Sequence, residues 1–350
     1  MLKIIGATLL VCLCSIGLHA QDSSDVSLFK ISGSADMYFR SDWNNPKHIT
    51  YNNFTSFTQS QNSFELGMAS VKLEHAIGKV GMIADLGFGK RAEEFSYNDT
   101  RSGVAIKQLL ITYAPSSKLK FTAGSFATHI GYELVDAYLN RNYSMSYMFS
   151  FGPFFHTGLK ADFLLGKKNT LMVGIANQSD LKSASVLPKM VIAQFATTSG
   201  DDKLKAWINF QGGKTNDSGR LYQGDLVLNY TLSESLSLGY NGTLQSRETK
   251  ISGKWESPRM WYGSALYINS DVRQWLGFTL RGEYFNDQKN VLGFGTDIFE
   301  TTLSANFKID NLTIIPEIRF ESAGTKMYSS HNENMVNKTG NFLVAVVYHF

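Results

Sequence analysis

Hydrophobic and polar residues alternate with a period of two from residue 29 onward, in one segment after another. In the first segment, Ile31, Met37 and Phe39 fall on one face of an extended chain. Asp36 and Arg40 fall on the opposite face. Successive side chains of a β-strand point to opposite sides, so this period indicates strands with one apolar and one polar face. The alternation therefore predicts an all-β chain.

Sixteen strands follow from the alternation and from the turn residues that separate the segments. The predicted strands are residues 29–40, 63–75, 80–89, 104–113, 119–126, 155–164, 170–177, 189–197, 203–211, 220–230, 236–245, 260–268, 274–285, 298–309, 312–321 and 340–350. Short turns alternate with longer polar loops, which include 41–62, 90–103, 127–154, 246–259 and 322–339. The facing of strands 104–113 and 189–197 is ambiguous, so fourteen or eighteen strands stay open as alternatives.

The polar face carries charges on nearly every predicted strand, which requires either bulk solvent outside the sheet or a water-filled interior. Aromatic residues favour the second arrangement, because they gather at both ends of the apolar face, as in the girdles of membrane barrels. These residues are Tyr113, Phe163, Phe195, Tyr230, Tyr267, Phe307 and Tyr348 at the short-turn end, and Phe39, Phe88, Phe210, Tyr284 and Phe320 at the long-loop end. The chain is therefore predicted to be a transmembrane antiparallel up-and-down β-barrel of 16 strands in a Gram-negative outer membrane.

Composition agrees with this class of protein. After the first 20 residues, no apolar run approaches the roughly 18 residues that a helix needs to cross a bilayer. The 30 glycines, 24 phenylalanines and 16 tyrosines, against 6 prolines, favour strands and tight turns. The mean hydropathy is −0.14 because one face of each strand is polar, so the average hides the apolar face.

Residues 1–20 have the features of a secretory signal peptide, with Lys3 at the positive start, an apolar centre and the small Ala20 before the cut. The barrel would then occupy residues 21–350. Cleavage removes both cysteines and lowers the formal net charge from +3 to +2. This charge gives no basis for nucleic-acid binding.

The C-terminus alternates Phe342, Val344, Val346, Tyr348 and Phe350 with other residues. This ending resembles the signature by which the barrel-assembly machinery recognises outer-membrane proteins. We therefore expect Tyr348 and Phe350 to contact that machinery.

The loop 127–154 follows the fifth strand and carries His129, Glu133, Asp136 and Arg141. In sixteen-stranded barrels that conduct solutes, the third outer loop folds inward and narrows the lumen, and this loop has the same ordinal position. Long loops in compact domains are more often functional than idle. The four residues are therefore predicted to form a constriction opposite the inward charges of the wall. In the alternative, the loop packs over the barrel mouth and its charges are merely solvated.

Charged residues of the polar face are predicted to line the pore. They are Lys30, Asp36, Arg40, Asp85, Lys160, Asp162, Lys205, Arg281, Glu283, Glu317 and Arg319. The other inward charges are Lys120, Lys308, Asp225, Glu300 and Glu321. The two signs are equally frequent in the whole set. Because a ring of one sign would select ions of the other, a balanced wall predicts little preference.

Motifs for catalysis and metal binding are weak. The histidines lack ligand spacing, and no cysteine is left after cleavage to join them. A lipid-modifying enzyme would need a serine and a histidine together at one rim of the barrel, and Ser70 and His75 come nearest. Their spacing does not enforce that geometry. The chain is therefore predicted to be no enzyme and to carry no cofactor.

Several short motifs resemble a known family. Residues 124–128 (GSFAT), 139–144 (LNRNYS) and 153–158 (PFFHTG) are similar to the central part of the OmpL-like β-barrel porin family. The first strand, with Asp36 and Tyr38, and the Asn-Asn-Pro that follows it are similar to that family's start. The resemblance implies a channel-forming outer-membrane protein, and it supplies neither a substrate nor functional residues.

The expected function is passive diffusion of small hydrophilic solutes through a barrel narrowed by loop 127–154. A structural or adhesion barrel with a closed lumen is the first alternative, and an outer-membrane lipid-modifying enzyme is the second. The expected partners are outer-membrane lipid, the barrel-assembly machinery and the solutes themselves. A homotrimer is expected only by analogy with other sixteen-stranded porins.

Overall fold

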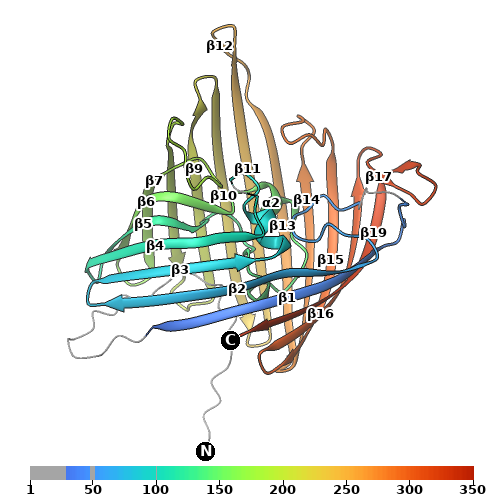
Figure 1. Ribbon diagram of the computed structural model, residues 1–350, viewed down its shortest axis with the longest axis horizontal. Coiled ribbons are helices and arrows are strands. Elements are labelled where there is room, and N and C mark those ends of the chain that lie inside the picture. Colours follow the sequence, from blue (N-terminus) through green and yellow to red (C-terminus); the bar gives the residue numbers. More distant parts are fainter. Residues whose placement is uncertain (1–28, 48–51, 100) are drawn as a thin grey trace, which may run out of the picture.

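Sixteen antiparallel strands close into a barrel in the computed structural model, which describes residues 29–47, 52–99 and 101–350 (Figure 1). The first strand, β1 (Lys30–Asp42), pairs with the last, β19 (Lys338–His349), and this pairing closes the ring. The strands between them are β2 (Ser63–Ile77), β3 (Val80–Phe88), β4 (Val104–Ser116), β5 (Leu119–Ala127), β6 (Phe155–Leu165), β7 (Asn169–Ala176), β8 (Met190–Thr198), β9 (Leu204–Asn216), β10 (Gly219–Ser233), β11 (Leu236–Ile251), β13 (Arg259–Arg273), β14 (Leu276–Asn286), β15 (Asp297–Ile309) and β16 (Leu312–Ala323). The predicted fold class and strand number are confirmed.

The remaining elements are short and lie in the longer loops. They are α1 (Lys90–Phe95), the 3₁₀ turn η1 (Ala137–Leu139), α2 (Tyr147–Phe151), β12 (Lys254–Trp255), β17 (Tyr328–Ser329) and β18 (Met335–Val336). Within the described ranges, no helix is long and apolar enough to span a bilayer.

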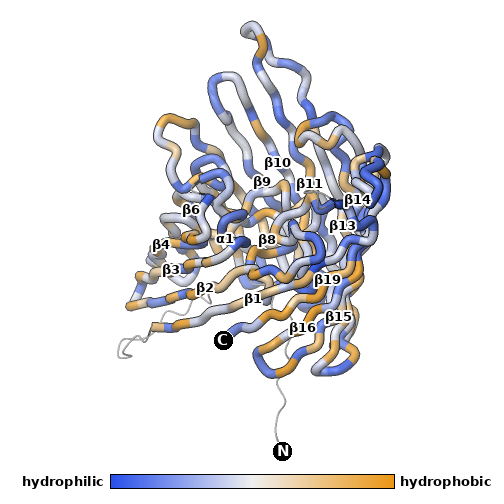
Figure 2. Tube along the Cα trace, turned by 45° about the vertical axis from the view of Figure 1, so that its right-hand side comes forward, coloured by the Kyte–Doolittle hydropathy of each residue, from blue (hydrophilic) through white to orange (hydrophobic). Residues whose placement is uncertain are grey.

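The alternation of the sequence separates an apolar outer face from a polar inner face (Figure 2). On β1, Ile31 and Met37 expose 59% and 52% of their surface to the outside, whereas Asp36 and Arg40 are buried against the inside. An apolar surface of this extent around a barrel is suited to lipid. One aromatic residue departs from the predicted girdle, because Tyr267 is buried on the inner face and donates to Glu133.

Strands β9 to β13 are longer than predicted. Residues 246–259, predicted as a loop, are largely strand, because the β10–β11 and β11–β13 backbone ladders continue as far as Thr249 and Arg259. These hairpins rise above the rest of the barrel (Figure 1). Apart from Ile251 and Trp255, the tip at residues 246–259 is largely polar on both faces, and so the alternation of the sequence is weak there.

Of the two chain ends, only the C-terminus lies within the described residues. The predicted signal peptide, residues 1–20, lies outside the described residues and stays a prediction. The C-terminal Phe350 exchanges two backbone hydrogen bonds with Gly33 of β1, at 3.0 and 3.1 Å. Tyr348 and Phe350 both point outward and are about half exposed. Their role in assembly stays a prediction.

Candidate functional site: the loop inside the barrel

Loop 127–154 crosses the lumen and bonds to opposite parts of the wall. The amide of Gly131 donates to Asp225 on β10 at 3.0 Å, and that of Tyr132 donates to Asn241 on β11 at 3.3 Å. Farther along the loop, the Tyr143 hydroxyl donates to Asp36 on β1 at 2.5 Å. In Figure 1, α2 accordingly lies within the ring of strands. Inner-face carboxylates and amides of the wall thus bond to the loop rather than to water alone.

A buried arginine of β14 ties the middle of the loop to the wall. Arg281 donates to Glu133 of the loop at 2.6 Å and to Glu300 of β15 at 3.0 Å. Its third partner is the carbonyl of Ser144, at 2.7 Å. The guanidinium has no solvent exposure, and a buried charge is tolerated only when it is paired and hydrogen-bonded.

Strand β16, which is separated from β14 by β15, repeats this arrangement. Arg319 donates to Glu321 at 2.5 Å and to the carbonyl of Met145 at 2.7 Å. The hydroxyls of Tyr147 and Tyr328 both donate to the same Glu321 carboxylate, at 2.7 and 2.9 Å. The loop is thus fastened to β16 through both backbone and side-chain atoms.

Glu283 of β14 accepts hydrogen bonds from the start of α2. Its two carboxylate oxygens accept the amides of Tyr147 and Met148, at 2.7 and 2.8 Å. The first amides of a helix have no partner within the helix, so an external carboxylate satisfies them. Ser146 caps the same turn by accepting the Phe149 amide.

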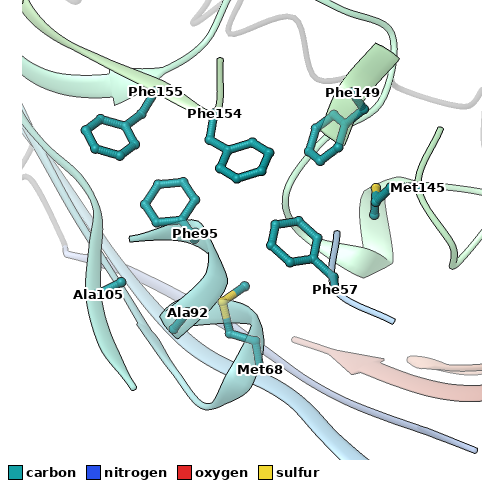
Figure 3. Packing of buried hydrophobic residues seen from close by; sticks show 9 residues of the cluster. All are labelled: Phe57, Met68, Ala92, Phe95, Ala105, Met145, Phe149, Phe154 and Phe155. Carbon is teal, nitrogen blue, oxygen red and sulfur yellow. The ribbon is translucent and has the colours of Figure 1, made fainter. Parts of the chain in front are cut away.

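A cluster of apolar side chains covers the outer side of the loop (Figure 3). Its aromatic members pack between α1, α2 and the start of β6, mostly with tilted rings, and the ring centroids are 5.0 to 6.1 Å apart. The cluster comprises Phe57, Met68, Ala92, Phe95, Ala105, Met145, Phe149, Phe154 and Phe155. Burial of so many aromatic groups gives the outer loops a hydrophobic core of their own.

The predicted constriction residues reach the wall separately rather than forming one group. Glu133 meets Arg281, and Asp136 meets Lys107, which also contacts Asp85. Arg141 makes two bonds to Asp271 of β13, at 2.7 and 3.0 Å.

His129 lies at the start of the loop and differs from the other three. Its Nε2 donates to the Phe210 carbonyl at 3.0 Å. Desolvation beside the wall lowers the pKa of His129 to about 4, so its ring is neutral at pH 7. It therefore contributes no charge opposite the wall.

The predicted pore-lining residues divide by burial. Those in the middle of the barrel are almost completely buried under the loop or between strands: Asp36, Arg40, Asp85, Arg281, Glu283, Glu317 and Arg319. Lys160, Asp162 and Lys205, nearer the short turns, keep partial exposure. Lys30 is 75% exposed at the rim, 3.6 Å from Glu74.

Comparison with known proteins assigns the chain to a family. Residues 28–350 match the family described as "putative beta-barrel porin-2, OmpL-like". The chain belongs to this porin family. It is accordingly an outer-membrane β-barrel protein of the Gram-negative type.

Solved porins share the fold at low sequence identity. An anion-selective porin from Comamonas acidovorans is 11% identical, with a TM-score of 0.63 over 93% of this chain and 100% of the other. OmpT of Vibrio cholerae is 10% identical, with a TM-score of 0.57 over 93% and 99%. OmpF of Salmonella typhi is 12% identical, with a TM-score of 0.59 over 92% and 97%. No curated protein matches the chain.

The sequence did not indicate two cationic residues that contact the loop of this porin. Arg91 of α1 donates to the Val135 carbonyl of the loop at 2.8 Å and lies over the rings of Phe57 and Tyr143. Arg91 lies in a short loop helix, where alternation carries no information. Lys107 lies on β4, whose facing is ambiguous because the β3–β4 register shifts between Asp85 and Leu86.

The serine and histidine considered for lipid chemistry do not meet in this porin. Ser70 is buried on the inner face of β2, 2.8 Å from the hydroxyl of Ser34. His75 lies on the outer face and stacks on Phe29 at 4.2 Å. A nucleophile and its base must share a hydrogen bond, which side chains on opposite faces of a strand cannot make.

Proposed function

We propose that this porin is a passive diffusion channel for small hydrophilic solutes, and that loop 127–154 sets its narrowest level. The carrying observation is the bonding of this one loop to β1, β10, β14 and β16, on different sides of the lumen. A loop held in this way cannot move aside freely, so a solute must pass between it and the wall. We assign the narrowing to His129, Glu133, Asp136 and Arg141 with their neighbours.

One observation favours a second candidate, a barrel whose lumen is closed at rest. Each of the sixteen barrel strands carries at least one inward side chain that is less than a tenth exposed. One such residue per strand, in chain order, is Asp36, Ser70, Asp85, Lys107, Thr122, His156, Met172, Ile192, Asn209, Asp225, Asn241, Tyr267, Arg281, Glu300, Glu317 and Leu343. The cavity between the loop and β13–β14 holds about 20 Å³, room for about one water molecule.

Single-channel recording in planar bilayers distinguishes the two candidates. We expect the purified wild-type protein to give discrete conductance steps. Deleting residues 129–141 should raise the conductance severalfold, because the fixed obstacle is removed. A control in which residues 249–257, at the protruding β11–β13 tip, are replaced by an Asn-Gly turn should leave the conductance unchanged.

The outcomes separate cleanly. Steps from the deletion variant but none from the wild type would support the closed barrel. No steps from either protein, both correctly folded, would overturn the channel. An unchanged conductance after the deletion would remove the role of the loop and leave the channel intact.

We extend the proposal to a homotrimer. One solved form of Vibrio cholerae OmpT, which is 10% identical to this chain, is described as a trimer. The mass of the purified protein in detergent tests this, and a monomer would contradict it.

A further inference from the structure

The end of the lumen near the short turns contains a distinct set of charges. We define the vestibule as the inner-face ionisable residues between the loop and these turns: Lys30, Lys72, Glu74, Lys120, Lys160, Asp162, Lys205, Asp271 and Lys308. Eight of these side chains are between 14% and 75% exposed. A solute in this part of the lumen therefore meets these charges in water.

Each vestibule acid is shared by two cations. Asp162 lies 3.8 Å from Lys160 and 3.9 Å from Lys120. Glu74 lies 3.6 Å from Lys30 and 2.5 Å from Lys72. Asp162 cannot neutralise both Lys120 and Lys160, because one carboxylate cannot offset two ammonium groups.

The remaining vestibule charges add to the same excess. Asp271 lies 2.9 Å from Lys308 and 2.7 Å from Arg141 of the loop. Lys205 has no acidic partner among the described residues. Among the described vestibule residues, six lysines thus accompany three acids, and Arg141 at the edge adds one more positive charge.

Asp162 excepted, the acids that balanced the wall in the sequence are not in this region. They lie at the level of the loop, where their oxygens already accept bonds from backbone amides, hydroxyls and buried arginines. Asp225, for example, accepts from the Gly131 amide and from Asn209 and Asn241, and is 5% exposed. The structure therefore separates acids that bond to protein from lysines that face water.

We propose that the vestibule makes the channel favour small anions over cations of similar size. The inference rests on the proposed channel function. A positively charged, water-filled mouth raises the local concentration of anions and lowers that of cations, which is how rings of Lys or Arg select anions in pores. Lys160 and Lys205 contribute most directly, since the first shares its acid and the second has none.

The test is the reversal potential of the purified full-length protein in a bilayer under a KCl gradient. We expect a chloride preference in the wild type. The double variant Lys160→Glu with Lys205→Glu should lower the chloride-to-potassium permeability ratio by about fivefold or more, the effect of one charge about 4 Å from an ion in water. Raising KCl from about 0.1 to 1 M should weaken the preference, as the screening length falls from about 10 to 3 Å.

The matched control is Lys118→Glu with Lys203→Glu, which makes the same charge change on exposed short turns outside the lumen. Its permeability ratio should stay close to the wild-type value. A cation preference or none in a conducting wild type, or equal shifts in both double variants, would overturn the inference but leave the channel standing. A wild type without conductance steps would overturn the proposed function, and the anion preference with it.

Discussion

The middle of the lumen and the vestibule use the same residue types in opposite ways. In the middle, Arg281 and Glu300 are 3.0 Å apart and neither is exposed. In the vestibule, Lys160 and Asp162 are 3.8 Å apart and each keeps 20% exposure. The first pair is enclosed under loop 127–154, whereas the second pair keeps contact with solvent. Burial, rather than residue type, therefore decides what a charged side chain does inside this barrel.

The difference in burial gives the two sets of ion pairs different physical effects. A buried ion pair is costly to break, because one charge is then left without water or partner, so such pairs fix the position of the loop. An exposed pair contributes little stability, and its field extends into the surrounding water. Charges in the middle of the lumen thus hold the loop in place, whereas in our proposal the charges in the vestibule act on the solute.

Removing Arg281 should have the largest effect on stability. The variant Arg281→Met keeps most of the side-chain volume but leaves Glu133 buried without its cation and leaves Glu300 with Arg319 alone, 3.8 Å away. We expect a loss of about 3–5 kcal/mol in the free energy of unfolding, typical of breaking a buried pair from one side. Urea titration in detergent, followed by tryptophan fluorescence, measures it.

Arg141→Met is the matched control, because Arg141 also joins the loop to a wall carboxylate. Its partner Asp271 is one-third exposed and keeps Lys308 at 2.9 Å. The expected loss is about 1 kcal/mol or less. Equal losses in the two variants would break the distinction between the two regions.

The fold was predictable because lipid outside and water inside impose opposite demands on alternate residues. All sixteen predicted strands overlap barrel strands. The prediction was wrong where those demands end, as at residues 246–259, which continue as strands beyond the apolar band. It was also wrong for Tyr267, since an aromatic residue at an expected girdle height can equally fill the interior.

The candidate site was predictable only in outline. The loop was identified by its length and its position after the fifth strand. Its contacts were not, because Glu133 and Arg281 are 148 residues apart and nothing local relates them. The balance of inward charges predicts little ion preference, and this stays a prediction beside our proposal for the vestibule. A one-dimensional pattern cannot tell which of those charges the loop will bury.

Asp180 is a buried carboxyl group among the outer loops. It offers a smaller, pH-dependent test of how burial affects a charged side chain. It lies between β7 and β8, and its Oδ1 accepts the amides of Phe154 and Phe155 at 2.7 and 3.0 Å. The Tyr97 hydroxyl donates to its other oxygen at 3.0 Å. The carboxyl group thus joins the end of loop 127–154 to two neighbouring loops. Burial raises the pKa of Asp180 from 3.8 to about 6, against the opposing effect of these bonds.

The sign of the pH dependence follows from that shift. The folded protein holds the Asp180 proton more tightly than the unfolded chain, so its contribution is greatest below pH 3.8 and is lost as the pH rises through about 6. The loss is at most about 3 kcal/mol, at 1.36 kcal/mol per pKa unit. Asp180→Asn should remove this component, so its urea midpoint should fall less than that of the wild type between pH 3.5 and 7.5. Asp217→Asn, at an exposed hairpin tip, should behave like the wild type. Identical pH profiles for all three proteins would mean that Asp180, although buried, holds its proton no more tightly in the folded protein than in the unfolded chain.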